Sequence, residues 1–470
     1  MLKTIALKEF TDTLRDGRFR VAAVLVGALL VVSVLVSRHY YQTVSRQHEQ
    51  AKRTARYQWE NQGSNNPHSA AHYGVYAFKP KYPLSMLDNG LDKYLGVSLF
   101  LEAHRQNESQ FKAIEDSSAL ARFGELTPAF VLIYLVPLLI VLMAFGAFTS
   151  EKESGNLRLV LSQGLSRRTW LLGKLAGVWL VLLTLVVPLF LIGLLFLAAS
   201  PGADGGEFAR FGLLALVLLL YFAVFVNVSV GVSAWAANSN GSLVLLLGFW
   251  MLSTLVLPKA TTNLARRLYP APSALAYQAA LEKDLKNGVD GHDSANEFSK
   301  KFERETLAKY GVDSVSQLPF NYWGLAMQAG EEHEEHVFDK HTRAIQDLYR
   351  RQLAVHQASA FLSPTILTRL LSMSLARTDL EAHYHFQQEA ENYRIRLVRD
   401  LNYELKDHSK YDDWEYQVNN DFFRKTARFD YQPVTLAYTT GQTAGKLVFL
   451  LGWVLVSLAG AWWAAAKLNG

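Results

Sequence analysis

The chain has 470 residues, of which 50% are apolar, a formal net charge of +5 and no cysteine. The absence of cysteine excludes disulfides, thiolate metal sites and a cysteine nucleophile. The small charge is not gathered into a dense basic block, so the composition carries no nucleic-acid-binding signature. The apolar residues form long runs instead of mixing with charge, which predicts helices buried in lipid rather than a large aqueous core.

Six apolar runs are long enough to be membrane spans. A bilayer core of about 30 Å requires roughly 20 helical residues. The sequence therefore predicts an all-α membrane protein with spans at 19–37, 128–148, 170–199, 211–235, 242–257 and 444–466. The charged stretch 1–18 is long and amphipathic, and no small-residue cleavage site comes after the first run. We expect an interfacial helix at 1–18 and a retained first span rather than a signal peptide.

Basic residues in the short loops predict the orientation of the spans. Five precede the first span, and five more surround the junction of the second and third spans: Lys152, Arg158, Arg167, Arg168 and Lys174. The short loop after the third span holds only Arg210. By the positive-inside rule, both termini and the segment 149–169 face the cytoplasm. The long segments 38–127 and 258–443 are then extracytoplasmic.

The two long segments are expected to be mainly helical and to pack against each other outside the membrane. In 258–443, the run Glu381–Leu405 repeats apolar residues at helical spacing, and Asp379 is placed to cap its start. Segment 38–127 has helical patterns at both ends, around a loop rich in glycine, asparagine and proline at 63–67.

The most informative stretch connects the second and third spans. Between Phe148 and Gly177 the chain runs FTSEKESGNLRLVLSQGLSRRTWLLGKLAG. Its front half predicts a short amphipathic surface helix, with Gly155 and Gly164 marking turns. A separate motor protein could grip such a helix, although charge alone favours a solvated connector.

The full stretch resembles the coupling segment of type-2 ABC transporter permeases. The residues that match the family pattern are Glu151, Glu153, Gly155, Leu157, Leu161, Ser162, Arg167, Gly173 and Lys174. Asn156 stands where threonine is usual, and Gly164 stands where proline is common. These two departures alter the local turn but not the placement of the segment.

Two further regions extend the resemblance over nearly the whole chain. The segment Lys8–Phe19 is similar to the N-terminal interfacial helix of the same family. Motifs in 258–273, 363–372 and 386–402 resemble the subfamily with a large helical extracytoplasmic insertion between the last two spans. Segment 38–127 is the least diagnostic part.

The resemblance implies a permease subunit without ATPase motifs, catalytic residues or a cofactor of its own, in which ATP is bound by a separate ABC ATPase dimer. The implied ATPase-coupling residues are Glu151, Lys152, Glu153, Gly155, Leu157, Arg158, Arg167 and Arg168. The segment 238–241 is either a further contact candidate or only a turn between two spans. A second permease chain, identical or different, would complete a multi-pass transporter in a bacterial inner membrane, with a possible extracytoplasmic partner protein. The substrate and the direction of transport stay open.

Histidines and acidic residues cluster at 331–341, in the second long segment. His333 and His336 share a helical face and are candidate metal ligands. They lack the His-Glu-x-x-His spacing of a metallopeptidase, and a charged, solvated helix is the simpler interpretation. They are the support for an alternative function, a membrane scaffold or cofactor-maturation component that presents a metal or a client protein.

Two other patterns limit the possible functions. The stretch Gly441–Lys446 has three residues between its glycines rather than four, and Leu447 stands where a phosphate-binding loop requires Ser or Thr. Asn227, Ser229 and Ser233 in the fourth span are expected to hold helices together. No predicted span carries Asp, Glu or Arg near its middle, which weakens an ion-coupled mechanism.

Overall fold

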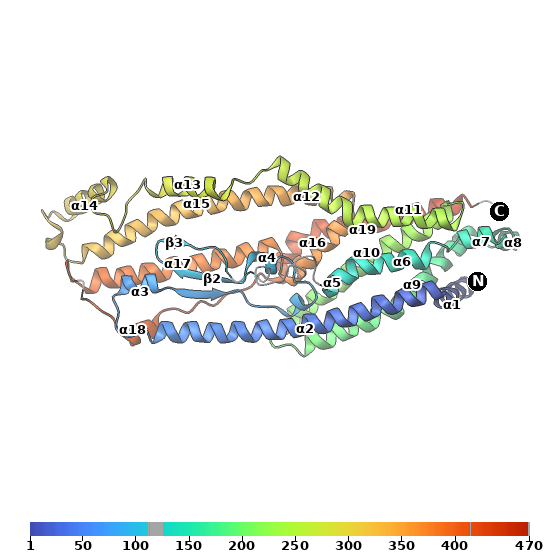
Figure 1. Cartoon of the computed structure of the whole chain (residues 1–470), viewed down its shortest axis with the longest axis horizontal. Helices are drawn as coiled ribbons and strands as arrows, with labels where there is room; N and C mark the ends of the chain where they lie inside the picture. The colour runs from blue at the N-terminus through green and yellow to red at the C-terminus, as the bar shows by residue number, and fades with distance from the viewer. Residues whose placement is uncertain (111, 113–125, 414, 469–470) are drawn as a thin grey trace.

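The computed structural model describes all residues except 111, 113–125, 414 and 469–470. The molecule is elongated, with the apolar helices towards one end and the long polar helices towards the other (Figure 1). Three short helices lie at the apolar end: α1 (Leu2–Arg15), α7 (Thr149–Glu153) and α8 (Asn156–Ser162). We call this end of the molecule the α1 end.

Six helical segments of the described chain are long and apolar enough to cross a membrane, which confirms the predicted all-α membrane fold. Four are single helices: α2 (Gly17–Glu60), α9 (Arg167–Ala198), α10 (Gly205–Trp235) and α19 (Leu436–Ala466). Two are composite. One joins α5 (Pro128–Phe130), η3 (Val131–Leu135), α6 (Val136–Ala144) and α7, and the other joins α11 (Ser239–Met251), η4 (Leu252–Val256) and α12 (Leu257–Leu268).

The composite spans contain π-helical turns next to prolines. The turn η3 lies just before Pro137, and the turn η4 lies just before Pro258. Proline has no N–H and its ring crowds the carbonyl one turn earlier, so the helix widens locally instead of keeping regular bonds. Pro188, by contrast, stays inside an unbroken α9.

Helix α10 is the centre of the apolar bundle. It packs against α6, α9 and α19, and its side chains Tyr221, Phe222 and Phe225 are fully buried in the bundle core. The Asn227 amide donates to Ser457 Oγ on α19 over 3.2 Å, as expected for a polar group that joins membrane helices. A Cβ on Gly231 would lie 2.9 Å from Ala461 Cα, so glycine permits this close crossing.

Beyond the spans, the chain forms what we call the distal domain, residues 61–110 and 269–435 together with the end of α2. Its main helices are α3 (Pro67–Tyr73), α4 (Asp92–Leu95), α13 (Ala274–Leu285), α14 (Glu297–Tyr310), α15 (Tyr322–Ala358), α16 (Pro364–Ala376), α17 (Leu380–His408) and α18 (Asn420–Lys425). Short 3-10 turns complete it: η1 (Pro83–Met86), η5 (Val315–Gln317) and η6 (Ser359–Phe361). Helix α16 packs against the apolar bundle and continues its core.

A small antiparallel sheet in the distal domain was not predicted from the sequence. It has the order β1 (Val75–Phe78), β2 (Ser98–Glu102), β3 (Arg105–Gln106). The helical pattern expected at the far end of 38–127 is wrong over these strands, and most of 111–125 lies outside the described residues. Val75, Tyr76 and Phe78 in β1 and Phe100 in β2 are β-branched or aromatic residues, which favour strands. The sheet is covered by a helix, since β2 packs on α17.

The two long segments pack together as expected. Trp59 near the end of α2 is 1% exposed and donates from Nε1 to Thr426 Oγ1 over 2.8 Å. Helices α15 and α17 lie side by side (Figure 1), and a Cβ on Gly324 would lie 2.6 Å from Lys406 N. Asp379 caps α17 as predicted, since its carboxylate accepts from Ala382 N–H over 3.0 Å.

Candidate functional site

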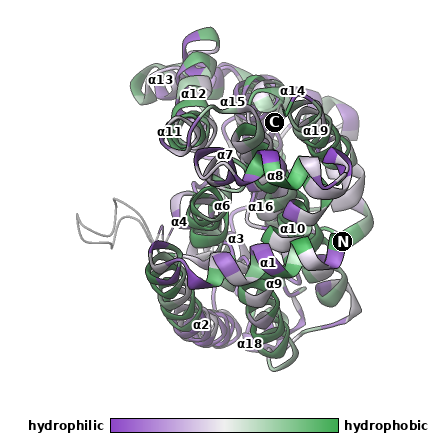
Figure 2. Ribbon diagram, turned by 90° about the vertical axis from the view of Figure 1, so that its right-hand side faces the viewer, coloured by the Kyte–Doolittle hydropathy of each residue, from purple (hydrophilic) through white to green (hydrophobic). Residues whose placement is uncertain are grey.

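Helix α1 lies flat across the end of the bundle, while α2, α6 and α9 are seen nearly end-on (Figure 2). It packs on α9 at two glycines. A Cβ on Gly173 would lie 2.6 Å from Ile5 Cγ2, and a Cβ on Gly177 would lie 2.4 Å from Glu9 Cβ. Only glycine therefore allows α1 to rest directly on the α9 backbone.

An ionic cluster fastens α1, α7 and α9 to one another. The Lys174 ammonium on α9 donates to Glu9 Oε2 over 2.7 Å and to Glu151 Oε1 over 2.8 Å. Lys8 adds a longer contact of 3.3 Å to Glu151. The Lys174 side chain is 4% exposed, and burial raises the pKa of the Glu9 carboxyl against the opposing effect of Lys174. Because buried charges are tolerated only with partners, Lys174, Glu9 and Glu151 depend on one another.

Helix α7 is also bound to the junction of α10 and α11. The Lys152 ammonium donates to two carbonyls at the C-terminal end of α10, Ala234 O at 2.6 Å and Ala236 O at 2.8 Å. The Glu153 carboxylate accepts from the N–H and the hydroxyl of Ser239 at the start of α11, both at 2.8 Å. A cation at a helix C-terminus and an anion at an N-terminus both complement the helix dipoles.

Helix α8 differs from α7 in its exposure. Gly155 separates the two helices in the left-handed conformation, with φ of 76° and open space around it, so backbone conformation rather than crowding requires glycine there. On α8, Leu157 is buried at 5% exposure, whereas Arg158 and Leu159 are exposed. The predicted surface helix corresponds to α8, in which Leu157 is turned inward and Leu159 outward.

The two remaining predicted arginines contact α19. Arg167 donates to Ala466 O over 3.2 Å, and the Arg168 guanidinium lies 5.1 Å from the centre of the Trp462 ring. Both therefore cover the end of the last span. The turn 238–241 lies beside α7 through the Ser239 contacts to Glu153.

Sequence reasoning found the charged residues of this site but not their pairings. Glu9 and Lys174 are 165 positions apart, and a single sequence carries no signal that joins them. Ser233 was expected to hold helices together, and its hydroxyl accepts from Phe148 N–H over 2.9 Å. The contact of Lys152 with a helix C-terminus was also missed, because nothing in the sequence locates the end of α10 next to α7.

The predicted metal candidates lie elsewhere, on α15. His333 Nε2 is 3.0 Å from the Leu285 carbonyl oxygen, which it meets as a donor. His336 lines a polar hollow with Glu332, Glu335 and Asp339. Neither residue belongs to a cluster of converging ligand atoms within the described part of the chain.

Two family models match the chain. Residues 33–264 match the ABC-2 family transporter protein, and residues 274–432 match a domain of unknown function, DUF3526. The second match falls inside the segment predicted as an insertion between the last two spans.

Curated proteins with detectable similarity are two proteins named probable ABC transporter permease protein NosY. The one from Pseudomonas aeruginosa is 31% identical over 128 residues, and the one from Stutzerimonas stutzeri is 34% identical over 130 residues. Each match covers 26% of this chain, and 46% and 45% of the respective relative, so less than half of each relative is spanned.

The six spans define a multi-pass helical membrane protein. Together with the family match, they narrow the class: over residues 33–264 the chain is similar to the ABC-2 family of transporter membrane proteins, and the NosY matches support a permease of that type.

Proposed function

We propose that this chain is a permease subunit of an ATP-driven transporter, and that a separate ABC ATPase drives it from the α1 end. The match of residues 33–264 to the ABC-2 family transporter protein supports the first part. One observation carries the second: α7 is fastened to α1, α9, α10 and α11 by charged side chains, whereas α8 next to it presents the exposed side chains of Arg158 and Leu159. A partner that binds the exposed helix α8 and displaces it would displace the neighbouring helix α7, and with it the spans to which α7 is bonded.

In this proposal the predicted coupling residues divide into two groups. Arg158 and the exposed Leu159 on α8 contact a cleft of the ATPase, as an amphipathic helix docks in a groove. Glu151, Lys152 and Glu153 do not contact the ATPase. They transmit displacement of α8 to the spans, because each is bonded to a different helix of the bundle.

A continuous route connects the α1 end with the distal domain. Lys152 holds one end of α10. Near the other end of α10, buried Arg210 donates to Thr439 Oγ1 over 3.0 Å and to Val434 O over 2.8 Å. A shift of α10 along its axis would therefore reach the distal domain without crossing a flexible linker.

The proposed assembly contains two permease chains and an ATPase dimer in a bacterial inner membrane, with the α1 end towards the cytoplasm. ATP binds and is hydrolysed in the partner. The cargo is either a transported molecule or mechanical force passed to a protein outside the membrane, through the distal domain.

The docking surface is tested with the double variant Arg158→Glu, Leu159→Glu. We expect loss of co-purification of the ABC ATPase from native membranes and loss of ATPase stimulation in nanodiscs. Leu275→Glu on α13 is the matched control, since Leu275 is 81% exposed and lies in the distal domain. A double variant that binds and stimulates the ATPase like the unmodified chain would remove the docking assignment.

The orientation is tested by single-cysteine labelling, which needs no background removal because the chain has no cysteine. Ser162→Cys reports on α8 and Ser294→Cys on the distal domain, and both positions are exposed. A membrane-impermeant maleimide should label Ser294→Cys in spheroplasts and Ser162→Cys only after permeabilisation. Labelling of Ser162→Cys in intact spheroplasts would place α8 outside the cell, where the ATPase is absent, and would contradict the proposed orientation.

A further inference from the structure

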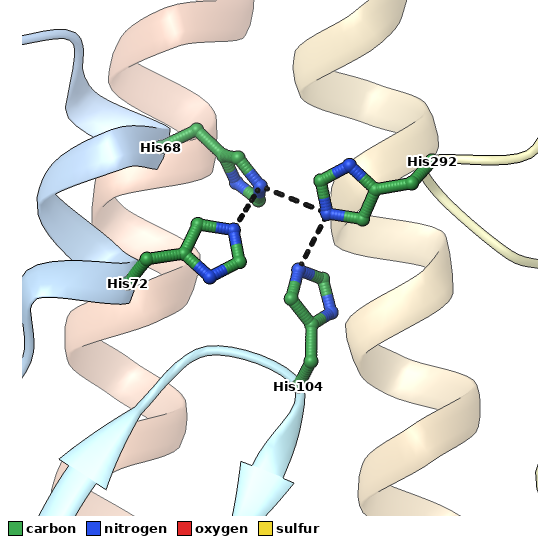
Figure 3. Close-up of side chains that lie close together, drawn as sticks. All are labelled: His68, His72, His104 and His292. Atoms are coloured by element: carbon green, nitrogen blue, oxygen red, sulfur yellow. Dashed lines mark hydrogen bonds between the residues drawn. The ribbon is translucent and has the colours of Figure 1, made fainter.

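Four histidine rings converge in the distal domain (Figure 3). Three contacts link their Nε2 atoms: His68 to His72 at 3.1 Å, His68 to His292 at 3.3 Å, and His292 to His104 at 2.9 Å. The candidate ligand atoms of the four rings all lie within 4.8 Å of one another. Their lone pairs are thus aimed at one small volume.

Two of the rings are oriented by acceptors on their other nitrogen. His68 Nδ1 lies 2.9 Å from Asn402 Oδ1, and the Asn402 amide nitrogen donates to Gln328 Oε1 over 3.3 Å, which fixes the amide orientation. His104 Nδ1 lies 2.8 Å from Glu334 Oε2. A ring that donates from Nδ1 presents an unprotonated Nε2, and this outer contact is characteristic of metal-binding histidines.

The fold brings the four rings together from three separate segments. His68 and His72 share one face of α3, a helix that begins at Pro67 after the Asn66 cap. His104 occupies the tight turn between β2 and β3, where it adopts the left-handed conformation with φ of 62°. A non-glycine residue with positive φ is uncommon, and such residues gather at functional sites.

The loop that carries His292 is held against α15 by two glycines. A Cβ on Gly291 would lie 2.7 Å from Met327 Cα, and a Cβ on Gly330 would lie 2.7 Å from Gly291 N. The next residue on α15, Glu331, accepts from His104 N–H over 2.8 Å. Glu331 is held in turn by buried Arg394 at 3.1 Å. The scaffold of the cluster is therefore rigid on two sides.

We propose that His68, His72, His104 and His292 form a four-coordinate site for a divalent late first-row transition-metal ion such as Zn²⁺. Metal–nitrogen distances of about 2.0–2.1 Å place tetrahedral ligands about 3.3 Å apart. The three observed contacts, at 2.9–3.3 Å, need to open by at most a few tenths of an ångström, and the remaining pairs, all within 4.8 Å, need to close around the ion. An all-imidazole set favours such ions over Ca²⁺ and Mg²⁺, which prefer oxygen.

The arrangement also indicates what the ion does. Four protein ligands fill a tetrahedral coordination shell, so no position is left for a reacting water. The site therefore binds the ion structurally and does not catalyse hydrolysis. Since its ligands come from both long segments, the ion joins α3 and the β2–β3 turn to the loop before α14. His72 and His292 are exposed, which gives the ion a path from solvent.

The test uses the full chain, purified with a histidine-free tag, stripped with a chelator and loaded with Co²⁺ or Zn²⁺. We expect about one ion per chain, with the intense visible absorption of four-coordinate Co²⁺, and no competition from Mg²⁺ or Ca²⁺. The variants His72→Ala and His292→Ala remove exposed ligands and should fold, which gel filtration checks. Both should lose the Co²⁺ spectrum, and Glu334→Gln should weaken binding roughly 10–100-fold.

The matched controls are His333→Ala and His336→Ala, which remove histidines outside the cluster and should bind like the unmodified chain. The proposal is overturned if the unmodified chain holds no stoichiometric ion, if bound Co²⁺ shows only the weak spectrum of a six-coordinate ion, or if His72→Ala and His292→Ala keep the spectrum and affinity. Because the site is remote from α8, this result is independent of the ATPase-docking test.

Discussion

The α1 end and the distal domain each contain a buried ionic triad, and the two have opposite signs. At the α1 end, Lys174 lies between the carboxylates of Glu9 and Glu151. In the distal domain, Asp92 lies between the ammonium groups of Lys79 and Lys81, at 2.7 and 3.0 Å. In both triads each charged group is paired with an opposite charge of the same chain, and both hold elements in place.

The histidine cluster is different from either triad. Its four rings present like groups to one another, and acceptors behind His68 and His104 hold two of them in that orientation. In each triad the opposite charges pair with one another and need no ligand. The four histidine nitrogens direct lone pairs at one another, and a bound cation would supply the missing partner. The two triads therefore position helices, whereas the histidine cluster is built to bind a ligand. Three substitutions at positions that hold or orient helices test the first half of this distinction.

The largest effect is expected for Lys174→Met. Removing the shared cation leaves the buried Glu9 carboxylate without its partner and Glu151 with only the longer contact to exposed Lys8, which costs about 3–5 kcal/mol. The melting temperature in detergent should fall, and α1 should become more accessible to protease. Lys8→Met is the control, because the Lys8 side chain is 61% exposed and its pairing contributes about 0–1 kcal/mol. Equal effects of the two variants would show that the buried cluster does not hold α1.

A smaller effect, about 3 kcal/mol, is expected for Asp92→Asn in the distal domain, because flexible lysine side chains can partly relocate their charge. Burial alone would raise the pKa of Asp92, but Lys79 and Lys81 outweigh burial and lower it. The stabilisation is therefore complete above the ordinary value of 3.8 and is lost as pH falls below it.

Melting curves of the unmodified chain and of Asp92→Asn, recorded from neutral pH downward, check this prediction. The difference between them should stay constant to about pH 4 and shrink only below that. A difference that already disappears near pH 6 would mean that Asp92 does not carry the triad.

The smallest effect on stability, about 1 kcal/mol, is expected for Gly155→Ala, because the left-handed conformation disfavours a Cβ. Its effect on function should be larger than its effect on stability, since the angle between α7 and α8 changes while the α7 anchors stay. Reduced ATPase stimulation with nearly unchanged melting temperature is the expected result. Gly248→Ala, a substitution with open space inside helix α11, is the control and should leave stimulation unchanged.

The spans were predictable because apolar runs report directly on lipid burial, and α8 was predictable because its motif is local. The pairings were not, since Glu9 with Lys174 and His68 with His292 depend on contacts between distant segments. One signal was present and overlooked: His68 and His72 come after Asn66-Pro67 at helical spacing, at the edge of the expected loop. The cluster at 331–341 was denser in histidine, but its rings face carbonyls and acids rather than one another.

Helix α2 has a mechanical consequence that arises from its length. It runs without interruption for 44 residues, which is about 66 Å, and only Asp16 separates it from α1. At that length, each degree of tilt at the membrane swings the far tip by about 1 Å. A modest rocking of its inner end would therefore become a sweep of several ångströms beside Trp59, making this rod a lever arm as well as a membrane anchor.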